Sequence, residues 1–123
     1  MPPPTVLLVE DDPVILRLLE VNFELEGFSV LLAHDGAEGI EVARAASPDL
    51  IISDIMMPKV SGIELVQTLK ADDGTSAIPI ILLSAKAQSS DVKAGIDAGA
   101  DDYVTKPFEP LDLVDRVNGL LKR

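Results

Sequence analysis

The hydrophobic residues of this chain gather in five short runs, each bounded by turn or loop residues. The runs lie at 6–9, 29–33, 50–54, 78–84 and 102–105. Short runs rich in Val, Ile and Leu between turn signals are typical of buried strands in a parallel sheet. The pattern therefore predicts five strands.

Helix signals follow the strands. Asp12 and Pro13 suit the N-cap and the first position of a helix. Ser61 and Glu64 have the spacing of a capping box. Pro110 opens the last helical segment. The signals predict helices that start close to the ends of the preceding strands.

The two remaining helices are predicted from their spacing and their ends. An Ala-rich segment after Asp35-Gly36 repeats apolar residues at three-residue steps and stops at Ser47-Pro48. A helix from about 90 to 98 is interrupted by Gly95, which costs about 1 kcal/mol relative to alanine. Gly99 is predicted to end that helix, as Gly27 is predicted to end the first.

Apolar spacing predicts the buried side of each helix. The first helix has an apolar row at steps of four, three and four, a second row beside it, and charges opposite. These sets are Val14, Leu18, Val21 and Leu25; Ile15, Leu19 and Phe23; and Arg17, Glu20 and Glu24. The core residues predicted for the third helix are Ile63, Val66 and Leu69. Those predicted for the last helix are Leu113, Val117 and Leu120, with Val114 and Leu121 beside them.

Strands that alternate with helices predict a parallel sheet with right-handed crossovers and helices on both faces. The fold class is therefore a doubly wound α/β fold with five strands and five helices. A chain of 123 residues without a linker or repeat is expected to form one domain, over residues 1–123.

Composition narrows the function. The chain has 21 acidic and 10 basic residues and a net charge of −11, which disfavours direct contact with nucleic acid. It has no cysteine, which excludes a disulfide framework and fits a cytoplasmic location. The sequence has no signal peptide at its start and no apolar stretch long enough to span a membrane.

Polar residues with useful chemistry stand directly after four of the strands. Glu10 and Asp11 follow the first, Asp54 ends the third, Ser84 ends the fourth and Lys106 follows the fifth. Since the carboxyl ends of parallel strands share one edge, these side chains should meet there. Crowded carboxylates need a counter-charge, and their oxygens suit Mg²⁺. With an ammonium and a hydroxyl added, the set suits a phosphoryl group in transfer.

The sequence resembles the receiver domain of two-component response regulators along essentially its whole length. The motifs that carry the resemblance are Val9-Glu10-Asp11-Asp12, Asp54-Ile55-Met56-Met57-Pro58, Leu83-Ser84-Ala85 and the segment from Ala100 to Phe108. The family fold is flavodoxin-like with strand order 2-1-3-4-5. The resemblance implies a cytoplasmic phosphoacceptor in a phosphorelay, which assists its own phosphorylation and dephosphorylation but is not an enzyme.

The resemblance also implies a role for each site residue. Asp54 would accept the phosphoryl group from a sensor histidine kinase or a phosphotransfer protein. Asp11, Asp54 and the backbone carbonyl of Met56 would bind Mg²⁺, with Glu10 acting through water. Lys106 would pair with a phosphoryl oxygen, and the Lys106–Pro107 bond would be cis. Met56 and Lys86 occupy positions where the family tunes phosphate lifetime.

Ser84 and Tyr103 would form the switch that moves the face made by the fourth helix, fifth strand and fifth helix. Asp102 and Arg116 match charged positions that pair across a homodimer in one branch of the family. Val92 is apolar where that branch has a basic residue.

Three other functions compete with this interpretation. A flavodoxin-like FMN module would need a Ser/Thr/Gly-rich loop where this chain has Glu10-Asp11-Asp12. A phosphatase of the haloacid dehalogenase type would have aspartate at position 56, where this chain has methionine. A pseudo-receiver that docks without phosphorylation is the remaining alternative, and the intact acidic residues disfavour it.

Overall fold

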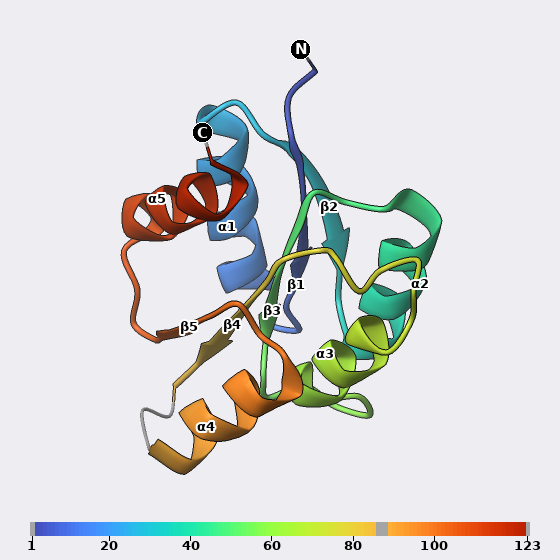
Figure 1. The fold of residues 1–123 in the computed structure, drawn as a ribbon. Helices are drawn as coiled ribbons and strands as arrows, with labels where there is room; N and C mark the ends of the chain where they lie inside the picture. The colour runs from blue at the N-terminus through green and yellow to red at the C-terminus, as the bar shows by residue number, and fades with distance from the viewer. Residues whose placement is uncertain (1, 86–88, 123) are drawn as a thin grey trace.

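A parallel sheet forms the centre of the structure, a computed structural model that describes residues 2–85 and 89–122. Within these residues five strands lie in the order β2-β1-β3-β4-β5, and each neighbouring pair is parallel. Five helices alternate with the strands in the described chain (Figure 1). The predicted doubly wound, flavodoxin-like fold with this strand order is confirmed.

The elements begin and end within about two residues of the predicted positions. The strands are β1 (Thr5–Val9), β2 (Ser29–Ala33), β3 (Leu50–Asp54), β4 (Ile80–Ser84) and β5 (Asp102–Thr105). The helices are α1 (Pro13–Leu25), α2 (Gly36–Ala46), α3 (Gly62–Lys70), α4 (Ser89–Ala98) and α5 (Pro110–Leu121).

The sheet is covered on both faces. Helices α1 and α5 pack on one face, and α2, α3 and α4 lie on the other (Figure 1). In β1, Val6 and Leu8 join the first of these cores, whereas Leu7 and Val9 join the second. Because successive side chains of a strand point to opposite faces, a sheet buried on both sides needs continuous apolar runs.

The predicted helix ends are found in the structure. Asp12 is the N-cap of α1, and its carboxylate accepts backbone N–H groups of the first turn. Ser61 and Glu64 form the reciprocal capping box of α3. Gly27 and Gly99 have φ angles of +90° and +112°, which a residue with a side chain rarely adopts.

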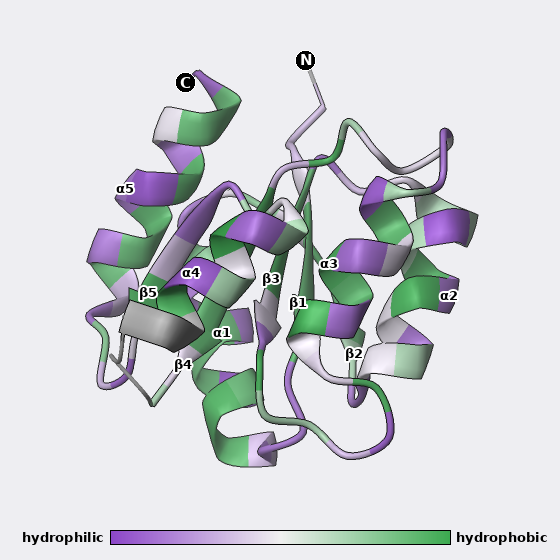
Figure 2. Cartoon of the chain, turned by 60° about the horizontal axis from the view of Figure 1, so that its bottom comes forward, coloured by the Kyte–Doolittle hydropathy of each residue, from purple (hydrophilic) through white to green (hydrophobic). Residues whose placement is uncertain are grey.

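The prediction of the buried face of α1 was right only in part, because Leu19 and Phe23 of the second predicted row are buried but the first row is not. The residues buried in the core are Leu16, Leu19 and Phe23. The predicted stripe is largely at the surface, where Val14 and Leu25 are 76% and 77% exposed. Helix α1 is apolar over most of its visible turns (Figure 2), so spacing alone left several candidate faces. Packing against the sheet and α5 selected one of them.

Smaller differences occur in α3 and α5. Leu65 is buried although it lies outside the predicted row, and Ile63 and Leu120 are only half-buried, whereas Val114 is buried beside its row as expected. The apolar surface of a helix that packs on a sheet is wider than a single row of residues, so one row underestimates it. No helix within the described residues is both long and apolar enough to cross a membrane.

Candidate functional site

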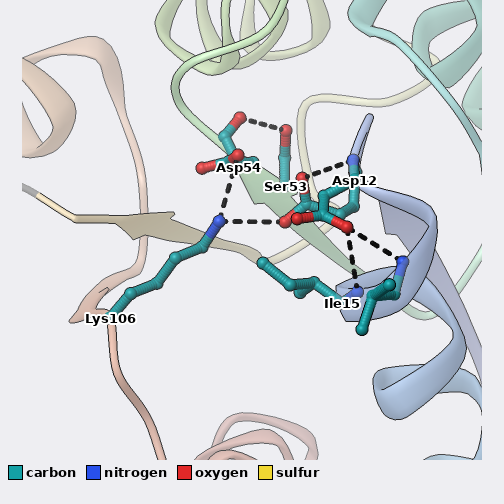
Figure 3. A network of polar contacts seen from close by, with 7 residues as sticks. Asp12, Ile15, Ser53, Asp54 and Lys106 are labelled. Atoms are coloured by element: carbon teal, nitrogen blue, oxygen red, sulfur yellow. Dashed lines mark hydrogen bonds and ion pairs between the residues drawn. The ribbon is translucent and has the colours of Figure 1, made fainter.

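The carboxyl edge of the sheet brings the predicted polar residues together. Glu10 follows β1, Asp54 ends β3, Ser84 ends β4 and Lys106 follows β5. Lys106 Nζ lies 3.0 Å from Glu10 Oε1 and 3.1 Å from Asp54 Oδ2 (Figure 3). The lysine that follows β5 therefore bridges the carboxylate that follows β1 and the carboxylate that ends β3.

Asp11 completes an acidic cluster at this edge. Glu10, Asp11 and Asp54 each offer a carboxylate oxygen, and these three atoms lie within 4.8 Å of one another. Glu10 and Asp54 are buried, with 1% and 5% of their surface exposed, whereas Asp11 is exposed. The cluster is therefore enclosed on the protein side and open to solvent beside Asp11.

The environment of the cluster changes two pKa values. Burial and the nearby charge of Asp54 raise the pKa of Glu10 to about 7, although Lys106 and a backbone N–H act in the opposite direction. Burial lowers the pKa of Lys106, but its contacts with Glu10 and Asp54 outweigh that effect and raise the pKa overall. The lysine stays charged, while one of the carboxyl groups titrates near neutral pH.

The backbone fixes Glu10 where β1 turns into α1. Its N–H donates to the carbonyl of Ala33, which extends the pairing of β1 with β2 by one residue. One of its carboxylate oxygens accepts the N–H of Asp12 at 3.1 Å. Asp12 in turn caps α1, so it is used by the helix rather than by the cluster.

Gly62 allows α3 to start directly against Asp54. A Cβ atom at position 62 would lie 2.3 Å from the backbone carbonyl oxygen of Asp54, a distance that no side chain can occupy. The Gly62 N–H donates to the carbonyl of Ile55 at 2.9 Å. Sequence analysis missed this residue, and its only signal was a glycine immediately after the N-cap Ser61.

The other predicted residues surround the cluster. Ser84 is buried, and its carbonyl accepts the N–H of Lys106 at 2.8 Å. Tyr103 is half-buried in β5, and the Lys106–Pro107 peptide bond is cis, as predicted. Met56 lies in the loop after β3 with a 61% exposed side chain. Lys86 lies outside the described residues.

The donor set of the cluster fits a hard divalent cation. All three residues offer carboxylate oxygens, and neither histidine nor cysteine is part of the group found among the described residues. Oxygen ligands, and a place left for water and phosphate oxygens, are what Mg²⁺ requires in proteins. Softer metals prefer nitrogen or sulfur ligands.

The fold and the cluster at its carboxyl edge together define a receiver-type α/β protein. The chain belongs to the response regulator receiver domain family, whose sequence model matches residues 6–118. It is 43% identical over 120 residues to the DNA-binding dual master transcriptional regulator RpaA of Synechocystis. The alignment covers 98% of this chain and 50% of RpaA, so the chain spans about half the length of that relative.

Solved receiver structures are closely similar. The receiver domain of the Francisella response regulator 1452 is 37% identical with a TM-score of 0.91, and the match covers 98% of each chain. The receiver domain of the sensor histidine kinase PA1611 from Pseudomonas aeruginosa is 29% identical with a TM-score of 0.91 over 98% of this chain and 99% of that one. The PA1611 structure has a magnesium ion coordinated in its active-site cleft.

Proposed function

We propose that this chain is a phosphoacceptor that receives a phosphoryl group on Asp54 in a Mg²⁺-dependent step. The observation that carries the proposal is the position of Asp54. Its carboxylate is buried, lies 3.1 Å from the Lys106 ammonium, and shares a cluster with Glu10 and Asp11 in a receiver fold. The donor is a phosphohistidine of a sensor histidine kinase or a phosphotransfer protein.

The transfer forms one bond and breaks one. An Asp54 carboxylate oxygen attacks phosphorus, the phosphorus–nitrogen bond of the phosphohistidine breaks, and its electron pair stays on the imidazole. Lys106 is already within contact distance of Asp54 and would hold a phosphoryl oxygen. Asp11, Asp54 and the Met56 carbonyl would hold Mg²⁺, with Glu10 acting through water. When bound, the ion supplies positive charge opposite the phosphoryl oxygens.

Phosphorylation would then change the face of the molecule that is formed by α4, β5 and α5. We expect the Ser84 hydroxyl to move toward a new phosphoryl oxygen and Tyr103 to turn into the space that is vacated. That local change would bias the arrangement of α4, β5 and α5. A groove of about 460 Å³ lies on this face, and Tyr103, Phe108 and Arg116 are among its lining residues.

The same face could form a homodimer after phosphorylation. Arg116 contacts Asp102 at 3.0 Å and Asp112 at 3.2 Å within this chain. A dimer that pairs Arg116 with Asp102 of a second copy would have to exchange these internal contacts for external ones. Sizing the protein with and without Mg²⁺ and beryllium fluoride measures whether that exchange occurs.

Incubation with Mg²⁺ and acetyl phosphate tests the phosphoacceptor function. We expect mass spectrometry to show one added phosphoryl group on the wild type and none on Asp54→Asn. Asp12→Asn is the matched control, because Asp12 caps α1 and should leave labelling intact. Equal labelling of the wild type and Asp54→Asn would refute the assignment, and no labelling of any protein would favour the pseudo-receiver alternative.

A further inference from the structure

Helix α4 contacts the sheet differently from its neighbours. Helices α1, α3 and α5 each bury at least three residues, among them large apolar side chains. Among the described side chains of α4, residues 92–98, Gly95 alone is buried. The buried contact of this part of α4 is therefore made by a residue without a side chain.

The space that a side chain at position 95 would need is already filled. A Cβ atom there would lie 3.1 Å from Leu82 Cδ1, 3.2 Å from Tyr103 Cδ2 and 3.5 Å from Tyr103 Cε2. Leu82 and Tyr103 are register partners in β4 and β5, and Leu82 is fully buried. Because register partners in a parallel pair point to the same face, the leucine and the tyrosine ring together form the surface on which α4 rests.

Helix propensity alone would favour another residue at this position. Glycine is much less favourable than alanine in the middle of a helix. Alanine, however, would require Leu82 or the Tyr103 ring to move by a few tenths of an ångström. The close packing against the tyrosine ring therefore accounts for the glycine that looked like a defect in the sequence.

We propose that Gly95 is a positioning residue that seats the Tyr103 ring against α4 in the unphosphorylated protein. The inference rests on the proposed function, since it concerns the residue expected to turn on phosphorylation. A methyl group at position 95 crowds both Leu82 and the tyrosine ring in the resting arrangement, but it crowds Leu82 alone once the ring has turned away. It thereby shifts the equilibrium toward the phosphorylated form of the switch.

The intrinsic fluorescence of Tyr103 provides a specific signal for this test. Tyr103 is the only tyrosine and there is no tryptophan, so intrinsic fluorescence reports on this ring alone. Gly119→Ala in α5 is the matched control, because a Cβ at position 119 would meet nothing within 4 Å. Both variants replace a helical glycine by alanine, but Gly95→Ala alone crowds the tyrosine.

We expect Gly95→Ala to change the emission and acrylamide quenching of Tyr103 before any phosphoryl mimic is added, and Gly119→Ala to match the wild type. Titration with beryllium fluoride in the presence of Mg²⁺ should give an apparent Kd lower by about threefold or more for Gly95→Ala. An unchanged or higher Kd, or an unchanged tyrosine signal, would overturn the inference.

If circular dichroism shows that Gly95→Ala does not fold, Gly95→Ala with Leu82→Val replaces it, because valine lacks the crowded Cδ1 atom. Leu82→Val alone is then the control, and the expected results are the same. Failure of the proposed function can be distinguished from failure of the inference about Gly95. In that case the wild type neither binds beryllium fluoride nor labels with acetyl phosphate, while the resting fluorescence still decides whether Gly95 seats the ring.

Discussion

Each edge of the sheet carries a lysine that pairs with an acidic residue, but the two lysines have different sets of partners. At the amino edge, Lys70 Nζ donates to the carbonyls of Ser76 and Ile78 at 3.3 and 2.7 Å and contacts Asp101 Oδ2 at 3.3 Å. Asp101 also accepts the N–H of Ile80, at the start of β4. An ammonium has three N–H donors, and all three have partners here.

At the carboxyl edge the carboxylates outnumber the ammonium. Lys106 contacts Glu10 and Asp54, and Asp11 adds a third carboxylate in the same cluster. Burial, with a smaller contribution from the charge of Asp54, raises the pKa of Glu10 to about 7, so the ammonium of Lys106 does not fully offset the loss of hydration. The comparison teaches that one ammonium can be fully matched by carbonyls and one carboxylate, whereas three carboxylates around one ammonium leave an excess of negative charge.

The largest effect on the free energy of unfolding is expected from removing the lysine at the amino edge. Lys70→Met would remove the lysine donor of two backbone carbonyls and one of the two donors of Asp101, and should lower the free energy of unfolding by about 2–3 kcal/mol. Urea unfolding measures this, with Lys93→Met at an exposed position of α4 as the control. A loss equal to that of the control would mean that the amino edge is held by other contacts.

The second largest effect on the free energy of unfolding is expected from removing one negative charge at the carboxyl edge. The pKa of Glu10 is about 7 in the folded protein against an ordinary value of 4.5, so the folded state binds a proton more tightly. The contribution of Glu10 to stability therefore falls as pH rises from about 4.5 to 7. In metal-free protein at pH 8, Glu10→Gln should raise the free energy of unfolding by an amount on the order of 1–2 kcal/mol.

That gain should shrink as the pH approaches 4.5, where Glu10 is neutral in the folded wild type. Urea unfolding in EDTA at the two pH values measures the difference. Glu41→Gln, at an exposed position of α2 outside the cluster, is a comparison variant that should not show this pH dependence. A Glu10→Gln variant that is less stable than the wild type at pH 8 would contradict the view of an uncompensated cluster.

The smallest effect is the stabilisation by the ion itself. At ten times the Kd, Mg²⁺ should raise the free energy of unfolding of the wild type by ~1.4 kcal/mol. Asp11→Asn removes one carboxylate of the cluster and should abolish most of that gain, whereas Asp73→Asn, in the loop after α3, should keep it. A gain that survives in Asp11→Asn would place the ion elsewhere.

Much of the carboxyl edge could be predicted because strand ends can be read from local patterns. Asp54 and Ser84 each close an apolar run, and parallel strands bring such ends to one edge. The contacts at the amino edge were not predicted. Lys70 is a basic residue in the last turn of α3, and its partners at Ser76, Ile78 and Asp101 are set by the loops that follow.

Local sequence thus determined the five strands and helices, their caps at Asp12 and Ser61, and the set of residues at the carboxyl edge, since each depends on neighbours along the chain. Only the tertiary structure decided that Leu16 rather than Val14 faces the core, that Gly62 touches Asp54, and that Gly95 receives the Tyr103 ring. Those choices depend on which surfaces meet across the fold. A row of apolar residues, or a lone glycine, carries no information about its partner.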